Sequence, residues 1–287
     1  MKTKMSIIKT SIFTAIIALS LQSCNTTTKK EKADTKVEPV EQKMQFADTP
    51  EGKAKALIYS MEQVNGGWSH LLSKNDVEFT YVYHDYAKGK DISTERLIFQ
   101  GETTFAKYTK HKVHVFPKQE GVVTQFLQDG NISATLAGKN ISDKAHLGVS
   151  KFLREVNPFW FSMMYKLSDP SVQAKFEGVE TVNDITYKKV TIGYTGTGKE
   201  ADDSYILYFN PDTNLVDFFY FSLPAWGINE AILRMELKYE KIDEVLIATE
   251  RTGFFPNPKT GELEEAGKFI STNIKFNNGF TTETITR

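Results

Sequence analysis

The stretch Phe159-Trp160-Phe161-Ser162-Met163-Met164-Tyr165-Lys166-Leu167 decides the fold, because its large apolar side chains would surround a helix on nearly every side. A helix of this kind cannot keep one face in water, so the rest of the chain must enclose it. Strand-like runs lie before and after this stretch, and a curved β-sheet is therefore the expected enclosure. We call residues 159–167 the helical plug.

A helix is also expected directly before the helical plug. Ser142 or Asp143 can cap a helix over residues 144 to about 156, with Phe152 on its buried side. Pro158 then either ends this helix or opens a second one, because proline lacks the backbone N–H that a helix interior needs.

Most of the remaining globular region consists of strand-like runs. Residues 77–86 alternate between apolar and polar side chains, and Asp129-Gly130 is a strong hairpin turn signal. Similar runs are 95–100, 104–110, 113–116, 121–128, 132–136, 174–179, 187–194, 204–209, 215–221, 232–239, 245–251 and 271–277. The expected fold class is mainly β (α+β): a curved antiparallel sheet or half-barrel with an N-terminal helix and an inserted helical plug.

The N-terminal helix is expected to begin at Thr49-Pro50-Glu51. This sequence supplies an N-cap hydroxyl, a proline in the first turn and an acid near the positive end of the helix dipole. Apolar residues recur at helical spacing from Ala54 to Val64. Asn65-Gly66-Gly67 ends the helix, because glycine adopts the left-handed conformation readily. Trp68 follows this break and is expected to anchor the core.

The first residues are typical of an export signal. Lys2, Lys4 and Lys9 give a basic start, and residues 12–21 form an apolar run that is too short to span a bilayer. Residues 25–34 contain no large apolar side chain, as in a solvated linker. We therefore expect a lipoprotein signal peptide at 1–23, a flexible tether at 24–48 and a single half-barrel domain at 49–287.

The end of the signal, Leu21-Gln22-Ser23-Cys24, resembles a bacterial lipobox. The resemblance implies that diacylglycerol is attached to the Cys24 sulfur, that the chain is cleaved before Cys24, and that the new amine is acylated, for example with palmitate. Several acyl chains anchor a protein durably, since each buried CH₂ contributes about 0.8 kcal/mol. The alternative is a plain secretory signal with an unrelated cysteine.

The expected location is the cell envelope, with the protein anchored through membrane lipid. Asn25 after the lipidated cysteine favours the outer membrane over retention at the inner membrane, on either its periplasmic face or the cell surface. Lys29-Lys30-Glu31-Lys32 is either a surface-export signal of the kind seen in Bacteroidetes lipoproteins or a solvated linker.

Composition and spacing exclude several binding functions. Lys+Arg number 35 against 36 Asp+Glu, so no basic face for nucleic acid is expected. The single cysteine excludes a disulfide framework and a cysteine-based metal cluster. Residues 193–199 have phosphate-loop spacing, but Glu200 stands where Ser or Thr must bind Mg²⁺, and a strand follows. We therefore predict that the protein binds no nucleic acid, no nucleotide and no cofactor.

The candidate catalytic and metal-binding patterns are weak. His111 and His114 are the only close histidine pair, but residues three apart on a strand face opposite sides and cannot chelate together. Solvent-facing strand histidines are expected instead. Glu95, Glu155 and Asp203 could converge as in glycoside hydrolases, which leaves a hydrolase as the less favoured alternative. We predict no catalytic residue and no metal ligand, and hence no enzyme.

Several strings in the domain resemble a Bacteroidetes lipoprotein family of unknown function, DUF6503. They are residues 152–161 (FLREVNPFWF), 165–170 (YKLSDP), 197–199 (TGK), 203–208 (DSYILY), 210–213 (NPDT) and 215–217 (LVD). The order of elements also resembles the half-barrel of LolA/LolB-like lipoprotein carriers. The likeness covers roughly residues 50–287 and implies the fold, but it implies no site residue because none is assigned in the family.

The predicted function is binding of an acyl chain, a lipid or another hydrophobic ligand in a half-barrel cavity. Aromatic and Met side chains are either core or cavity wall, and as a wall they would adapt to an apolar ligand. The candidate lining residues are Phe152, Phe159, Trp160, Phe161, Met163, Met164 and Trp68. The alternative is a structural or partner-binding envelope lipoprotein that presents its sheet to another envelope protein.

Overall fold

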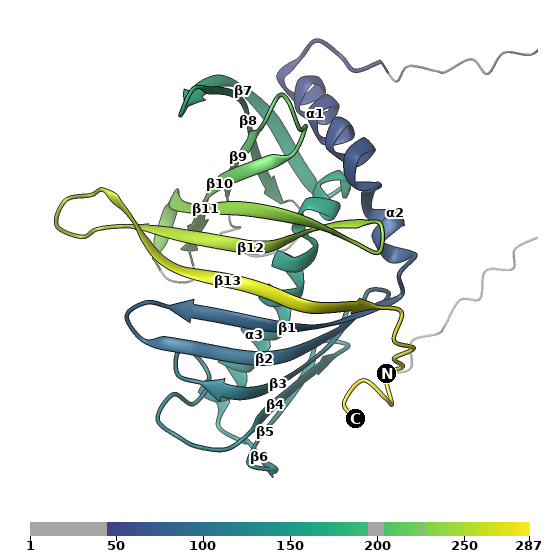
Figure 1. The fold of residues 1–287 in the computed structure, drawn as a ribbon, viewed down its shortest axis with the longest axis vertical. Coiled ribbons are helices and arrows are strands. Elements are labelled where there is room, and N and C mark those ends of the chain that lie inside the picture. The colour runs from purple at the N-terminus through teal and green to yellow at the C-terminus, as the bar shows by residue number, and fades with distance from the viewer. Residues whose placement is uncertain (1–44, 195–203, 225–226) are drawn as a thin grey trace, which may run out of the picture. The chain divides into compact units, whose positions relative to one another are not determined.

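In the residues that the structure describes, thirteen strands form a single antiparallel sheet (Figure 1). The computed structural model describes residues 45–194, 204–224 and 227–287. The strands are β1 Asp76–Asp85, β2 Gly89–Ile98, β3 Thr103–His111, β4 Val123–Gln128, β5 Asn131–Leu136, β6 Lys139–Asn140, β7 Val172–Val182, β8 Ile185–Tyr194, β9 Tyr205–Phe209, β10 Val216–Leu223, β11 Ile228–Ile242, β12 Val245–Pro256 and β13 Leu263–Phe276. Their order in space is β6-β5-β4-β3-β2-β1-β13-β12-β11-β10-β9-β8-β7.

This strand order consists of two meanders that meet in the middle of the sheet. Strands β1 to β6 run outward to one edge, and β7 to β13 run back from the other edge until β13 pairs with β1. The segment between β6 and β7 must therefore connect opposite edges of the sheet. Helix α3 (Lys144–Ser162) and the 3₁₀ helix η1 (Met163–Ser168) make this connection across one face, behind the strands in Figure 1.

Local capping signals set the starts of the long helices. At the start of α1 (Pro50–Asn65), the Thr49 hydroxyl accepts a hydrogen bond from a backbone N–H at 3.1 Å. At the start of α3, the Asp143 carboxylate accepts one from the backbone N–H of His146 at 2.9 Å. Gly66 ends α1 with a φ of 85°.

Three hydrophobic clusters lie on the face of the sheet that carries α3, and the helical plug contributes to two of them. Met163, Met164 and Leu167 of η1 pack with α1 and with strands β8 to β12. Phe161 packs in the second cluster, where its ring stacks on Phe79 of β1 with centroids 4.6 Å apart. The helical plug is thus enclosed, and the predicted fold class is confirmed: a curved antiparallel sheet with an N-terminal helix and an inserted plug.

Pro158 neither ends the helix nor opens a second one, because α3 continues through it to Ser162. A proline inside a helix leaves the carbonyl oxygen four residues earlier without its N–H donor. That oxygen belongs to Arg154, and it accepts a hydrogen bond from the Thr104 hydroxyl of β3 at 3.2 Å. The sheet therefore satisfies the group that Pro158 leaves unpaired, which explains the continuous helix.

Other local predictions were wrong or incomplete. Residues 113–116 form part of the β3–β4 connection and not a strand, since the backbone N–H groups of Val113 and His114 donate to the Asp91 carboxylate. The chain also forms a short helix, α2 (Gly67–Leu72), directly after Gly66, and Trp68 lies within it. The predicted signal peptide, Cys24 and the tether up to residue 44 lie outside the described residues.

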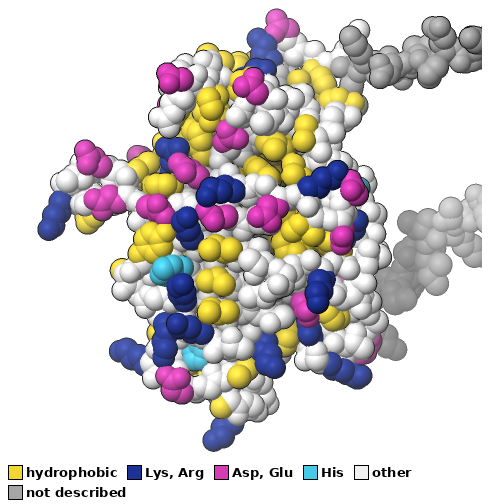
Figure 2. Space-filling model, viewed as in Figure 1, with side chains coloured by type: hydrophobic (Ala, Val, Ile, Leu, Met, Phe, Trp, Pro, Cys, Tyr) yellow, Lys and Arg dark blue, Asp and Glu magenta, His cyan; other side chains and the backbone are white. Residues whose placement is uncertain are grey.

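The face of the sheet opposite α3 carries charged side chains of both signs among hydrophobic ones, as Figure 2 shows. On β12, Glu250 pairs there with Lys238 and Lys268 at 2.8 and 3.0 Å. On β11, Arg234 pairs with Glu236 at 2.7 Å. In the described ranges, no helix has both the length and the apolar character needed to cross a membrane.

We expect the substitution Phe161→Ala to lower the free energy of unfolding by about 3–5 kcal/mol, because it removes a buried ring and leaves a cavity between α3 and β1. Urea denaturation followed by circular dichroism measures this change. Val179→Ala is the control, since Val179 is 60% exposed and should shift stability by less than about 0.5 kcal/mol. Equal effects of the two substitutions would contradict the enclosed position of the plug.

Candidate functional site

A groove of about 180 Å³ lies between α3 and the sheet. This volume is well above the roughly 10–15 Å³ that a single water molecule needs. The wall is mainly apolar and aromatic, and it also includes polar side chains, among them Asp91 and Arg251. The lining residues are Tyr81, Tyr83, Asp85, Lys88, Asp91, Tyr108, His114, Phe152, Leu153, Val156, Asn157, Trp160, Phe221, Leu223, Ile228, Met235, Arg251, Phe255 and Phe269. We call this space the groove.

Strand register brings three lining side chains together at the middle of the sheet. Tyr83 of β1 stands opposite Phe269 of β13, and Phe269 stands opposite Arg251 of β12. Residues directly opposite each other in a sheet share one face, so all three side chains point towards α3. The rings of Tyr83 and Phe269 stack with centroids 4.5 Å apart, which gives the groove a rigid aromatic wall.

Helix α3 supplies the opposite wall, and Trp160 closes the groove towards the core. The Trp160 ring stacks on Phe219 at 5.4 Å and meets the edge of Phe221 at 5.3 Å. At the far end, Phe255 is 39% exposed and the Lys88 side chain is 60% exposed. The groove therefore opens to solvent at the β1–β2 and β12–β13 hairpins and ends beneath Trp160.

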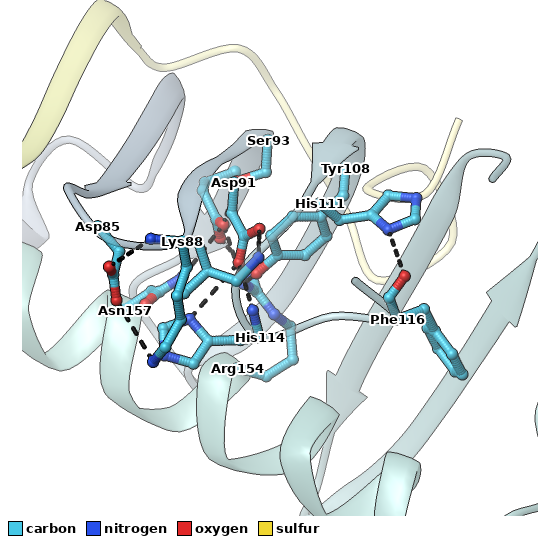
Figure 3. Close-up of polar contacts among 12 residues, drawn as sticks. Asp85, Lys88, Asp91, Ser93, Tyr108, His111, His114, Phe116, Arg154 and Asn157 are labelled. Carbon is cyan, nitrogen blue, oxygen red and sulfur yellow. Dashed lines mark hydrogen bonds and ion pairs between the residues drawn. The ribbon is translucent and has the colours of Figure 1, made fainter. Parts of the chain in front are cut away.

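The polar end of the groove is built around Asp91 (Figure 3). The Asp91 carboxylate accepts hydrogen bonds from the backbone N–H of Val113 at 2.8 Å and of His114 at 3.0 Å. Burial alone would raise the pKa of Asp91, but the hydrogen bonds from His114 and Val113 outweigh it and lower the pKa. Tyr83 beside this end has a raised pKa, chiefly because of burial. Asp91 therefore stays ionised and fixes the loop at the groove's rim.

A buried ion pair fixes α3 to the sheet next to the groove. The Arg154 guanidinium of α3 binds both oxygens of the Glu95 carboxylate on β2, one of them at 2.9 Å, and both side chains are almost fully buried. Arg154 also donates to the Tyr108 hydroxyl and to the Gln125 side-chain oxygen, each at 3.1 Å. Asn157 donates to Glu95 at 3.2 Å from the next turn of α3.

The opposite charges of Arg154 and Glu95 stabilise each other in their ionised forms. Burial alone would lower the pKa of Arg154, but attraction to the Glu95 carboxylate outweighs it and raises the pKa. Figure 3 shows Arg154 reaching from α3 towards Tyr108 on the sheet. Bidentate pairing of this kind sets direction as well as distance, so it holds α3 in one register above the strands.

The structure distributes the predicted lining residues over three places. Phe152 and Trp160 line the groove. Trp68 and Phe159 line a separate pocket of about 200 Å³ that also includes Arg154 and Lys166. Phe161, Met163 and Met164 surround only about 10 Å³ of free space, so their side chains are close-packed.

Sequence reasoning missed the lining residues that come from the sheet, among them Tyr81, Arg251 and Phe269. The alternation on β12 carried a usable signal, because Val245, Ile247 and Arg251 occur at odd positions of one strand. A basic residue at an inward position of an apolar strand side indicates a buried charge. The sequence alone does not show which elements lie opposite it.

The prediction of solvent-facing strand histidines is wrong for His111, and His114 lies in the β3–β4 connection rather than on a strand. His111 is buried rather than solvent-facing, and its two ring nitrogens lie 3.1 and 2.7 Å from the carbonyl oxygens of Phe116 and Gly121. His114 stacks on Tyr83 with centroids 5.0 Å apart. Among the described residues, no group of three or more metal-ligating side chains occurs.

The carboxylates considered for a hydrolase do not form a shared site in the described residues. The Glu95 carboxylate is bound by Arg154 and also accepts a hydrogen bond from Ser93 at 2.7 Å. Glu155 is exposed on α3, where it lies 3.8 Å from Lys151. Asp203 lies outside the described residues. The Glu95 carboxylate is therefore occupied by its ion pair with Arg154, which fixes α3 to the sheet.

No family model matches the sequence, and no curated protein matches it significantly. Among solved structures, a LolA superfamily protein from Nitrosomonas europaea aligns with a TM-score of 0.48 and 9% identity, covering 84% of this chain and 99% of its own. A DUF1329 family protein from Desulfovibrio piger aligns with a TM-score of 0.47 and 13% identity, covering 83% and 97%. Both likenesses are distant, and membership of DUF6503 stays a prediction.

We expect Glu95→Gln to lower the free energy of unfolding by about 3–5 kcal/mol, because it leaves the buried Arg154 without a counter-charge. The double substitution Glu95→Leu with Arg154→Met should recover most of this loss, since it removes both charges. Urea denaturation of the single and double variants measures the coupling. Glu155→Gln on the exposed side of α3 is the control, and a double variant no more stable than Glu95→Gln would contradict the pairing.

Proposed function

We propose that this protein binds a single acyl chain, or a hydrophobic ligand of similar width, in the groove between α3 and the sheet. The observation that carries the proposal is the groove itself, a mainly apolar space of about 180 Å³ beside hydrophobic clusters of the core. Ligand sites in proteins are concave and mostly apolar, with a few polar groups that set orientation. The groove has this composition.

The chemistry of the wall suits a flexible hydrocarbon chain. Each CH₂ group moved from water into an apolar site contributes about 0.8 kcal/mol, so six of them contribute about 5 kcal/mol. Met235 and Phe221 face this space with adaptable or flat apolar surfaces. The mouth at Phe255 lets one end of a long chain extend into solvent.

The location that accompanies this proposal is the cell envelope. The export signal at residues 1–23 and the lipobox-like Leu21–Cys24 support a lipid anchor at Cys24, and Asn25 supports the outer membrane. An anchored protein would hold its ligand close to the membrane, where acyl chains are abundant.

The partner-binding alternative has less support. In the described residues, the exposed large hydrophobic side chains are distributed over separate helices, strands and turns, at Val64, Tyr86, Val122, Val149, Val179, Ile232 and Phe255. A protein-binding face needs a continuous apolar patch, and scattered side chains do not provide one.

Filling the groove should weaken ligand binding. Gly253 of β12 lies outside the left-handed region, and a Cβ there would lie 3.6 Å from the Phe269 ring and 4.0 Å from the Met235 methyl, both of which line the groove. We expect Gly253→Leu to weaken binding of N-phenyl-1-naphthylamine by at least about tenfold, which corresponds to about 1.4 kcal/mol. Fluorescence titration of the purified full chain measures this change.

Gly253→Ala is the matched control, because one methyl group fits at van der Waals distance and should leave the affinity nearly unchanged. Thermal unfolding of both variants checks that the fold persists. If Gly253→Leu is folded and still binds the dye with full affinity, the groove is not the binding site.

The lipid anchor is tested separately by the mass of the chain isolated from membranes. We expect the intact mass to show loss of residues 1–23 and addition of diacylglycerol and an acyl group at Cys24. Cys24→Ser should retain residues 1–23 and carry no lipid. A wild-type mass equal to unmodified residues 24–287 would contradict anchoring.

A further inference from the structure

Arg251 is a buried cation without a carboxylate partner in the described part of the chain. The residue is 2% exposed, and its side chain lines the inner end of the groove. None of the ion pairs found there within 4.0 Å involves it. Burying a charge is costly unless it is paired, so this position calls for an anion.

The contrast with Arg154 is informative, because both guanidinium groups are buried on the same side of the sheet. Arg154 is held by both oxygens of Glu95, so its charge is compensated within the protein. Arg251 has only neutral partners: its Nη1 donates to the carbonyl oxygen of Trp160 at 3.1 Å, and its Nη2 lies 3.5 Å from the Tyr81 hydroxyl. Its hydrogen-bonding capacity is therefore only partly used.

The unused capacity of Arg251 faces a site that can hold a ligand. A guanidinium carries five N–H donors in a planar fork, and that fork matches the two oxygens of a carboxylate. The guanidinium carbon lies 5.9 Å from the ring centroids of both Tyr81 and Phe269, which line the groove beside it. The Tyr81 hydroxyl lies within reach of the same fork and can donate to an oxyanion.

We propose that Arg251 binds the carboxylate of a long-chain fatty acid, whose tail lies along the groove towards Phe255. This inference rests on the proposed function and names the ligand class for the same groove. A single positive charge matches the single negative charge of a carboxylate, whereas a phosphate monoester carries nearly two. Among the described lining residues, the other side chain with a permanent positive charge is Lys88 at the solvent end, where it lies 3.4 Å from Asp85.

The geometry also sets the direction of the ligand. Arg251 and Phe255 lie on the same strand, about 13 Å apart at about 3.3 Å per residue. Apolar side chains of β10 and β11, Phe221, Leu223, Ile228 and Met235, flank this path. The head group thus binds at the closed end beneath Trp160, and the end of the tail reaches the mouth.

The test compares two ligands of equal chain length on the unaltered protein. Palmitate and 1-hexadecanol differ only in the charged head group, and each is titrated to displace N-phenyl-1-naphthylamine from the purified full chain. We expect palmitate to bind about 10- to 100-fold more tightly, because its carboxylate gains charge-assisted hydrogen bonds that the alcohol lacks. This arm needs no variant, so a folding defect cannot obscure it.

The second arm removes the cation. Arg251→Met should weaken palmitate binding by about 10- to 100-fold and change hexadecanol binding by less than about threefold, while Arg251→Lys should restore part of the preference. Arg234→Met is the matched control, because Arg234 lies on the outer face against Phe218, is paired with Glu236, and does not line the groove. It should leave both affinities unchanged.

The outcomes separate this inference from the function it rests on. Equal affinity of the wild-type protein for palmitate and hexadecanol overturns the role of Arg251 and leaves an apolar groove in place. Equal weakening of both ligands by Arg251→Met also overturns it, since the residue then only supports α3 through Trp160. Failure of the dye and both ligands to bind overturns the proposed function itself.

Discussion

The buried ion pair between Arg154 and Glu95 holds α3 in its path across the sheet, and the groove depends on that path. Because β6 and β7 are opposite edges of one sheet, the chain between them has to cross a face. Thr104 and Asn157 add hydrogen bonds at the same crossing. The helix is thus held by directional polar contacts at one point and by hydrophobic packing at the plug.

Much of the fold could be predicted from the sequence, because strand alternation and helix caps are local signals. Residues 77–86 and the Thr49-Pro50-Glu51 start behave as their patterns indicate. The continuation of α3 through Pro158 could not be predicted, since the donor that satisfies its free carbonyl oxygen is Thr104, fifty residues away. The strand prediction for residues 113–116 was wrong for a similar reason, because the Asp91 carboxylate on another strand accepts hydrogen bonds from the backbone of Val113 and His114.

The candidate site was less accessible to sequence reasoning. Phe152 and Trp160 belong to an apolar run that any hydrophobicity argument would select, but Phe161 and Met163 belong to the same run and are packed into the core. Only the three-dimensional position of α3 separates the two groups. Arg251 was missed because the alternation on β12 indicates only that its side chain faces inward and does not show which elements lie opposite it. Its importance becomes visible only in the assembled sheet. There, the residues opposite it in the register of β12, β13 and β1 are Phe269 and Tyr83, and neither is a carboxylate.

The pairing of the first strand with the last has a consequence for biosynthesis. Val77 of β1 stands opposite Phe276 of β13. These two strands are neighbours in the middle of the sheet, but nearly the whole sequence of the domain separates them. A ribosome or a translocation channel delivers the chain from its N-terminus, and β1 stays an unpaired edge until β13 emerges. Contacts of such high sequence separation form slowly. Completion of the sheet is therefore a late event. In a chain truncated before β13, the sheet lacks a central strand rather than an edge strand.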